Sequence, residues 1–405
     1  MQSETLRWAA NRLPKTETAD IASFGEEELQ KAKRFHESIP AYARTPLVFL
    51  DDFAKLLGVK SVYLKDESKR FGLNAFKALG SSFAIAKYMA ARLGVDVSEF
   101  SYERLVSDEV KEKLGDITFV TATDGNHGRG VAWAAKRLRK KAVVYMPKGS
   151  SDIRRDNIAA EGADVSVTDV NYDDCVRLAD AYVKTHPNSV LVQDTALPGY
   201  TEIPLWIMQG YGTMVLEAAE QLAETGVSMP THVFIQAGVG SLAGAVQGFF
   251  AAKYGAHGPA VTVVESDLAD CYYQSAKKGG ADFVCVDGEM QTLMAGLACG
   301  EPNPIGWDIL RNYAAAFISA SDIVAATGMR LLAAPAGRDA RIVSGESGAV
   351  PTGALYTIMT KEAHADLREH LHLDENSVVL LFSTEGDTDP EMYREIVWEG
   401  RNAKL

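Results

Sequence analysis

The stretch ITFVTATDGNHGRGVAWAAKRLRK, residues 117–140, indicates how this chain is built. An apolar, β-rich run over 117–123 ends in a polar glycine turn, and a helical pattern follows over 126–140. Apolar residues recur in that pattern at the spacing of one helix face: Val131, Ala134, Ala135 and Leu138. A strand, a glycine turn and a helix in this order are typical of an α/β protein with a parallel sheet.

The same unit recurs along the chain. Further strand-like runs alternate with helical stretches and cover 61–65, 142–147, 164–169, 189–194, 261–267 and 377–384. This alternation predicts open, twisted, mostly parallel sheets with helices on both faces. A length of 405 residues exceeds one typical domain. We therefore expect a discontinuous large domain, 1–79 with 206–405, a small α/β domain, 80–205, and an active site in the cleft between them.

Composition excludes several classes of partner. The net charge is −13 and there is no basic stripe, which disfavours nucleic acid and anionic membranes as partners. The N-terminal segment lacks the apolar core of a signal peptide, and no apolar run approaches the ~20 residues that span a bilayer. The four cysteines and eight histidines show no metal-ligand spacing, so we expect no metal site and a reducing, cytoplasmic location.

A first candidate group lies in KDESKRFGLNAFKALG, residues 65–80. Lys77 stands between Phe76 and Ala78 at the start of a helical pattern. If this lysine is desolvated, its amine favours the neutral form that Schiff-base chemistry requires. From this segment alone, however, a solvated lysine at a helix end explains the pattern better.

A second candidate group is the turn after the 117–123 strand. The N–H groups of a helix start bind anions, and the Asn126 amide suits a ring oxygen of a planar cofactor. Asp124 either caps this helix or has a task at the substrate. Asp194 ends its own strand, and it is either a second carboxylate near the substrate or a cap of the following turn.

A third candidate group is VFIQAGVGSLAGAV, residues 233–246. The turn Gly238-Val239-Gly240-Ser241 can cradle a phosphate at a helix start. The same turn also satisfies the GxGxxA pattern of dinucleotide-binding folds, and Glu265 follows about 25 positions later, where such folds place their ribose-binding acid. This segment alone therefore favours a nicotinamide or flavin site. Gly345–Ala349 resembles a nucleophile elbow but lacks its final glycine, so a serine hydrolase is disfavoured.

Four elements in this order resemble the fold-type II pyridoxal-phosphate enzymes, the group of threonine deaminase, serine racemase and tryptophan synthase β. The elements are Lys77, Gly125-Asn126-His127, the 238–241 turn and Ser383-Thr384. The resemblance implies that Lys77 carries pyridoxal phosphate and that Asn126 meets its phenolic oxygen. It implies further that the 238–241 turn holds the phosphate, that Ser383 or Thr384 meets the pyridine nitrogen, and that the protein is a homodimer.

A closer resemblance is carried by eight segments over nearly the whole chain: KDESKRFGLNAFK, ATDGNHGRGVAWAA, NYDD, VQDTA, IMQGYGT, AGLACGEPNP, SGESGAV and STEGDTD. They are similar to the ammonia-lyases of this family that convert D- and L-2,3-diaminopropionate to pyruvate and two ammonia molecules. This implies that Asp124 either pairs with the β-ammonium group of the substrate or acts as a second base on the face opposite Lys77. It also implies that Asp194, Gly125 and His127 lie at the substrate. A serine or threonine deaminase and a nicotinamide-dependent dehydrogenase remain the alternatives.

Overall fold

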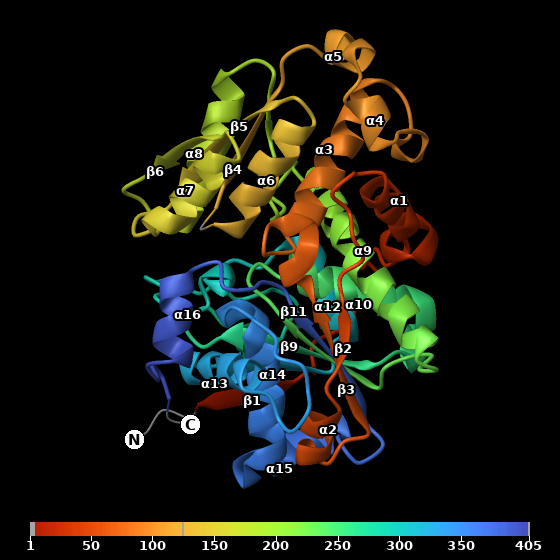
Figure 1. Ribbon diagram of the computed structural model, residues 1–405, viewed down its shortest axis with the longest axis vertical. Helices are drawn as coiled ribbons and strands as arrows, with labels where there is room; N and C mark the ends of the chain where they lie inside the picture. The colour runs from red at the N-terminus through yellow and green to blue at the C-terminus, as the bar shows by residue number, and fades with distance from the viewer. Residues whose placement is uncertain (1–4, 124, 404–405) are drawn as a thin grey trace. The chain divides into compact units, whose positions relative to one another are not determined.

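The computed structural model describes residues 5–123 and 125–403, which form two compact units (Figure 1). Unit 1 consists of the described parts of Met1–Gly25, Thr45–Lys69 and Glu217–Leu405, and unit 2 of those of Glu26–Arg44 and Arg70–Leu216. Short 3-10 helices occur in both: Ala22–Phe24, Glu67–Gly72, Val97–Glu99, Gly255–His257, Ala295–Leu297 and Glu362–His364. Within the described ranges, none of the helices combines the length and the apolar character that crossing a bilayer requires.

Unit 1 is built on a seven-stranded sheet with the order β1-β10-β9-β8-β11-β3-β2. Its strands are β1 (Leu6–Ala10), β2 (Leu47–Phe49), β3 (Ser61–Asp66), β8 (His232–Gln236), β9 (Ala260–Ser266), β10 (Ala316–Ala320) and β11 (Val378–Ser383). The inner pairs are parallel, and only the edge strands β1 and β2 are antiparallel to their neighbours. Every residue of β3, β8, β10 and β11 is buried, as expected for strands covered on both faces.

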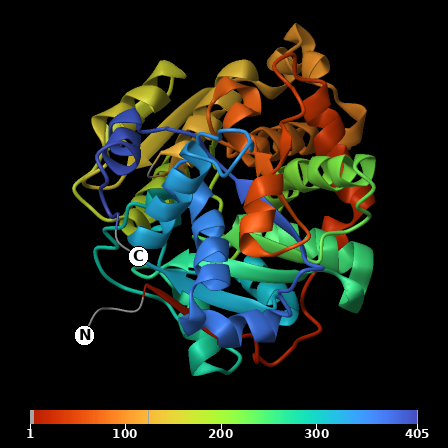
Figure 2. The ribbon, with the colours of Figure 1, turned by 60° about the horizontal axis from the view of Figure 1, so that its bottom comes forward.

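Two helices of unit 1 approach each other closely beside this sheet. A Cβ at Gly328 of α13 (Asp322–Ala333) would meet the Ala349 carbonyl of α14 (Glu346–Thr360), and one at Gly353 would meet the Val324 carbonyl. Glycine at both positions therefore lets the helix backbones touch. In Figure 2 the blue α14 lies across the sheet strands, and it contacts β8, β9 and β11. The other helices of unit 1 are α2 (Asp51–Leu57), α10 (Ser241–Tyr254), α11 (Cys271–Lys278), α12 (Pro304–Tyr313), α15 (Ala365–Leu371) and α16 (Pro390–Val397).

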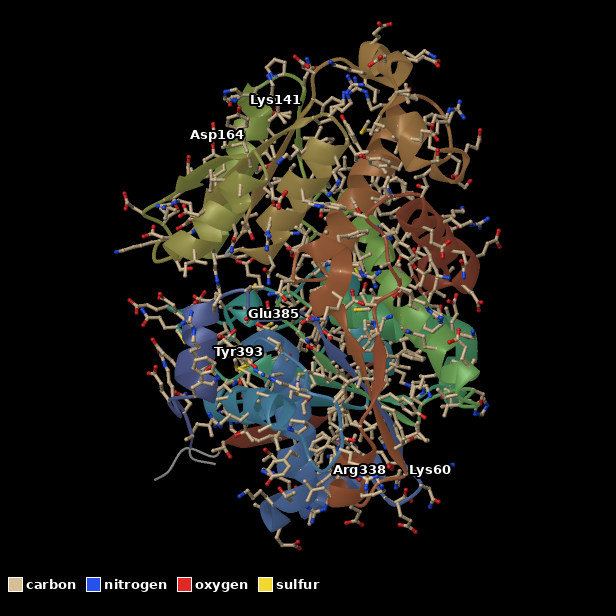
Figure 3. The ribbon with its side chains drawn as sticks, viewed as in Figure 1. Lys60, Lys141, Asp164, Arg338, Glu385 and Tyr393 are labelled. Atoms are coloured by element: carbon tan, nitrogen blue, oxygen red, sulfur yellow. The ribbon has the colours of Figure 1, made fainter. Side chains whose placement is uncertain are left out.

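Unit 2 contains a four-stranded, fully parallel sheet with the order β6-β5-β4-β7. Its strands are β4 (Thr118–Ala122), β5 (Lys141–Met146), β6 (Asp164–Val167) and β7 (Ser189–Leu191); Lys141 and Asp164, which begin β5 and β6, are labelled in Figure 3. The helices are α1 (Glu26–Glu37), α3 (Ala78–Arg92), α4 (Tyr102–Leu105), α5 (Asp108–Leu114), α6 (Asn126–Arg137), α7 (Asp152–Ala160), α8 (Tyr172–Thr185) and the first part of α9 (Glu202–Glu224).

The expected mostly parallel α/β architecture is confirmed, with differences at the borders. The helix expected over 126–140 ends at Arg137, because Leu138 caps it and Arg139 takes a positive φ of 58°. The contact-defined units differ from the division at 79/80 and 205/206. Helix α1 joins unit 2 because the His36 ring is hydrogen-bonded to Thr213 Oγ1 at 2.7 Å and to the Leu79 carbonyl at 3.0 Å. The placement of the active site between two domains stays a prediction.

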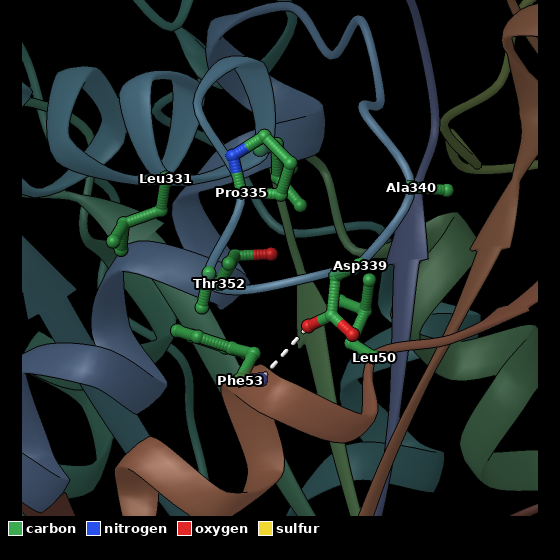
Figure 4. A pocket seen from close by; sticks show the side chains of 9 residues that line it. Leu50, Phe53, Leu331, Pro335, Asp339, Ala340 and Thr352 are labelled. Atoms are coloured by element: carbon green, nitrogen blue, oxygen red, sulfur yellow. Dashed lines mark hydrogen bonds between the residues drawn. The ribbon is translucent and has the colours of Figure 1, made fainter.

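A small apolar pocket lies between α2, the C-terminal end of α13 and the middle of α14 (Figure 4). Its empty space is about 240 Å³, open solvent included, and its lining is Leu50, Phe53, Leu331, Leu332, Pro335, Ala336, Asp339, Ala340 and Thr352. The Asp339 carboxylate accepts the N–H groups of Asp52 (3.0 Å) and Phe53 (2.8 Å) and so caps α2. The Thr352 hydroxyl is buried and has no hydrogen-bond partner among the described residues.

We expect Thr352→Val to raise the free energy of unfolding by about 1 kcal/mol, because a buried hydroxyl without a partner costs free energy and valine has the same shape. Thr357→Val is the matched control on the same helix. The Thr357 hydroxyl is equally buried but donates to the Gly353 carbonyl at 2.8 Å, so its loss should destabilise the protein by about 1 kcal/mol. Urea unfolding of both variants measures the two changes; the same sign for both would contradict the argument.

Candidate active site

Lys77 lies directly before the first residue of α3, at the end of a bent loop. Phe71 and Asn74 in this loop take positive φ values of 51° and 60°, which non-glycine residues rarely adopt. The Phe71 ring packs on Trp133 of α6 at 4.7 Å between centroids, and Arg129 of α6 donates to the Leu73 carbonyl at 2.9 Å. Helix α6 therefore fixes the loop that delivers Lys77.

The Lys77 ammonium forms an ion pair with Asp194, with 2.5 Å between Nζ and Oδ2. The Lys77 side chain is 20% exposed and that of Asp194 only 4%. Burial raises the pKa of Asp194. The charges of Lys77 and His127 and the hydrogen bond from Lys77 outweigh this effect and lower the pKa to about 2. Asp194 is therefore a carboxylate at neutral pH. The structure places it beside the candidate lysine, and its expected role at the substrate stays a prediction.

His127 lies in the first turn of α6 and is also held near Asp194. Its Nε2 is 2.8 Å from the Val192 carbonyl, which can only accept, so Nε2 carries a proton and donates it. Its Nδ1 is 3.9 Å from Asp194 Oδ2. Asn126, the first residue of α6, is partly exposed. Asp124 lies outside the described residues, so its expected role stays a prediction.

The start of α6 is capped by a residue that the sequence analysis missed. The Thr123 hydroxyl accepts the N–H groups of Gly125 (2.9 Å) and Gly128 (3.1 Å). A hydroxyl directly after the β4 strand is an ordinary capping signal, and it could have been found from the sequence.

The turn that carries Asp194 is fixed by two further residues that were not predicted. The Gln193 side-chain oxygen accepts the Ala122 N–H at 3.0 Å and so links the ends of β4 and β7. The Tyr200 hydroxyl accepts the Gln193 N–H at 2.8 Å and donates to the Leu191 carbonyl at 2.9 Å. The only sequence signal for this support was the segment VQDTA, which contains Gln193.

In unit 1, the 238–241 turn joins β8 to α10 as predicted. Gly240 has a φ of +89°, and a Cβ there would run into the Tyr272 ring. The Tyr272 hydroxyl donates to the Val239 carbonyl at 2.9 Å, and Asn303 Nδ2 lies 2.7 Å from Ser241 Oγ. The start of α10 therefore presents a rigid turn of the kind that binds phosphate. The sequence analysis did not single out Tyr272 or Asn303. Asn303 lies in the segment AGLACGEPNP and caps α12 before Pro304, which is a signal in the sequence, whereas nothing near Tyr272 marks it.

The hydroxyls of Ser383 and Thr384, at the end of β11, are both buried and both hydrogen-bonded. Ser383 Oγ donates to Ser344 Oγ at 2.7 Å, and Gln236 Nε2 donates to Thr384 Oγ1 at 2.7 Å. Glu385, labelled in Figure 3, accepts the N–H of Ser347 at 3.2 Å in the first turn of α14. These bonds hold both hydroxyls in place but do not choose between them as partners of a cofactor nitrogen.

Glu265, the acid that a dinucleotide site would require, has a different task. Its two carboxyl oxygens accept the N–H groups of Tyr272 (2.8 Å) and Tyr273 (2.7 Å) at the start of α11. Burial raises its pKa well above the ordinary value. A fully buried side chain that caps a helix cannot also bind a ribose. Glu265 therefore cannot serve as the ribose-binding acid that a nicotinamide site would require.

The residues present suit pyridoxal phosphate. Lys77 supplies an amine for an aldehyde, and Asp194 supplies a compensating buried charge. The Tyr272 ring packs directly against Gly240 and fixes the turn, and the N–H groups at the start of α10 suit a phosphate.

Comparisons with known proteins agree with this chemistry. Residues 39–384 match the family model of pyridoxal-phosphate dependent enzymes. The chain is 55% identical over 370 residues to the diaminopropionate ammonia-lyase of Salmonella typhimurium strain LT2, and the matched region covers 91% of each chain. The crystal structure of the Escherichia coli diaminopropionate ammonia-lyase with D-serine is 50% identical, with a TM-score of 0.91. Its complex with an aminoacrylate-PLP azomethine reaction intermediate is 49% identical, with a TM-score of 0.89; each covers 98% of both chains.

The chain therefore belongs to the pyridoxal-phosphate dependent enzymes, and the expected fold-type II architecture and cofactor are confirmed. Within that family it groups with the diaminopropionate ammonia-lyases, as the eight sequence segments predicted.

The ion pair of Asp194 predicts a pH-dependent contribution to stability. Because the pKa is about 2 in the folded protein and ordinarily 3.8, the carboxylate stabilises the fold above pH 4, by about 2 kcal/mol. This contribution is lost as the pH falls from about 4 to 2. The stability difference between wild type and Asp194→Asn should thus shrink by about 1 kcal/mol between pH 6 and pH 3 in urea unfolding. Asp180→Asn, which breaks a surface pair with Lys184, is the control; a pH-independent difference for Asp194→Asn would contradict the prediction.

Proposed function

We propose that this protein eliminates ammonia from 2,3-diaminopropionate and yields pyruvate and two ammonia molecules, as the name of its Salmonella relative implies. The observation that carries the proposal is the Lys77–Asp194 ion pair with His127 beside it, in a chain of this family. A cationic and an anionic side chain at one place suit a substrate that carries both a carboxylate and ammonium groups.

The chain's own residues can divide the tasks of holding the cofactor. Pyridoxal phosphate, when bound, acts as an electron sink that lowers the cost of removing the substrate α-proton. Lys77 would hold its aldehyde carbon, and Asn126 would hydrogen-bond its phenolic oxygen. The 238–241 turn would bind its phosphate through backbone N–H groups, with the Ser241 hydroxyl positioned by Asn303. Either Ser383 or Thr384 would meet its pyridine nitrogen, and each offers an uncharged hydroxyl.

Acid–base chemistry would be divided between two faces of the substrate. Lys77 would take the α-proton of the L enantiomer and Asp124 that of the D enantiomer. Asp194, ionised at neutral pH, would attract the β-ammonium group of the substrate and would pair with Lys77 whenever the lysine amine is free of the cofactor. Gly125 and His127, at the start of α6, would bind the substrate carboxylate.

We also propose a cytoplasmic homodimer, on the strength of the family resemblance. The thiols of Cys175 and Cys271 are free and buried, which suits a reducing compartment. Burial raises the pKa of both thiols, so they stay protonated and unreactive.

The first experiment measures pyruvate and ammonia release by the purified protein with pyridoxal phosphate. Both enantiomers of 2,3-diaminopropionate are offered, with serine and threonine in parallel. We expect rapid pyruvate formation with two ammonia molecules per pyruvate from both enantiomers, much slower turnover of serine, and none by Lys77→Ala. Turnover of serine or threonine without diaminopropionate would replace the proposal by a hydroxyamino-acid deaminase.

Asp124→Asn tests the division of proton transfer between two bases. Removing the carboxylate base should lower kcat on the D enantiomer by about 10²- to 10⁴-fold, the usual contribution of a general base, and affect the L enantiomer far less. Asp116→Asn, a change on the loop before β4, is the control and should leave both rates unchanged. Equal rates of Asp124→Asn on the two enantiomers would refute the two-base mechanism.

A further inference from the structure

Tyr211 lies against the segment that carries Lys77 and has no part in the proposed mechanism. It belongs to α9, within the segment IMQGYGT, and its side chain is fully buried. Its ring packs on Phe76, with 4.7 Å between the centroids. A Cβ at Gly80 would come within 2.6 Å of Cε1 and 2.9 Å of Cζ of the same ring. The edge of the ring that bears the hydroxyl therefore faces the first turn of α3, which starts beside Lys77.

The Tyr211 hydroxyl is buried and forms no hydrogen bond of good geometry with the described residues, although the Lys77 amine comes near it. Leaving such a group unsatisfied is unfavourable, so phenylalanine would pack at lower cost unless the hydroxyl has a task. Burial raises the pKa of Tyr211, and the charge of Asp194 adds to this rise, whereas the charge of Lys77 and the approach of its amine to the hydroxyl oppose it. The phenol is therefore neutral at working pH, and the charges that act on it are those of the catalytic pair.

The Lys77–Asp194 ion pair alone does not provide a base. An ammonium group held 2.5 Å from a carboxylate keeps its proton, whereas a base must present a neutral amine with its lone pair directed at the substrate. A neutral amine needs a partner that fixes its direction without favouring its charge. The Tyr211 hydroxyl is such a partner, because it is uncharged and buried against the Lys77 segment.

We infer that Tyr211 is a positioning residue for Lys77. When the amine leaves Asp194, the Tyr211 oxygen accepts one of its N–H bonds and leaves the nitrogen lone pair free to take the α-proton. This inference rests on the proposed function, in which Lys77 is the base for the L enantiomer. Tyr211 should also affect a step that involves no substrate, because covalent uptake of the cofactor requires a neutral, oriented Lys77 amine.

Tyr211→Phe removes only the hydroxyl and tests the inference. Tyr393→Phe, on α16 in unit 1, is the matched control, because its hydroxyl is also buried and has no partner among the described residues (Figure 3). The first measurement is the rate of the absorbance change when protein freed of cofactor takes up pyridoxal phosphate. The second is kcat and KM on each enantiomer of diaminopropionate, and the third is the Tm.

For Tyr211→Phe we expect uptake of the cofactor to slow about tenfold, as the loss of one hydrogen bond allows. We expect kcat on the L enantiomer to fall by about the same factor, with KM and the rate on the D enantiomer within about twofold of wild type. The Tm should be unchanged or higher, and Tyr393→Phe should match wild type in both rates.

Three results for Tyr211→Phe would overturn the inference. They are cofactor uptake at the wild-type rate, a ratio of L to D rates equal to that of wild type, or a Tm several degrees below that of wild type. The last would mean that the hydroxyl serves the fold. If wild type itself releases no pyruvate from diaminopropionate, the proposed function fails, while the uptake rate still decides whether Tyr211 positions Lys77.

Discussion

The ion pair between Lys77 and Asp194 is the interaction on which the candidate site in unit 2 depends. Two opposite charges at low exposure stabilise each other only while their geometry holds, because a shift of either leaves a charge in a poorly solvated place. The pair joins the start of α3 to the chain after β7, which are 117 positions apart. Two further contacts fix the positions of these segments. Gln193 accepts the Ala122 N–H, and α6 approaches α3 closely at Gly130.

The segment KDESKRFGLNAFK contains a second buried lysine, and the contrast explains why only one suits a ligand. The Lys65 ammonium is completely enclosed and donates to Glu217 (2.6 Å), Gln221 (2.8 Å) and the Thr45 carbonyl (2.8 Å). Three acceptors match the three donors of an ammonium group, so Lys65 serves the fold of unit 1. Lys77 retains 20% exposure and has a carboxylate partner that a substrate ammonium can share.

The elements that sequence reasoning predicted well are those encoded locally. The strand, glycine turn and helix around 117–140 and around 233–246 show the periodicity of each element and a turn residue at the right place. The supports of the site were not predictable in this way. Tyr272 and Asn303 reach the 238–241 turn from 33 and 62 positions away, and Tyr211 reaches the Lys77 segment from another helix. Such contacts are decided by packing in three dimensions, of which a single sequence carries no local pattern.

Glu265 shows why the 238–265 segment pointed to the wrong cofactor class when taken alone. A dinucleotide fold and a pyridoxal-phosphate fold need the same glycines for the same reason, since both bring a phosphate against the first turn of a helix. The glycine pattern therefore does not distinguish a dinucleotide from pyridoxal phosphate. The difference lies in the acid after the next strand, which here turns inward and binds two N–H groups of α11. Because α11 in turn supplies Tyr272, which donates to the Val239 carbonyl, this carboxyl stabilises the phosphate turn indirectly and from the interior, where no ribose can reach it.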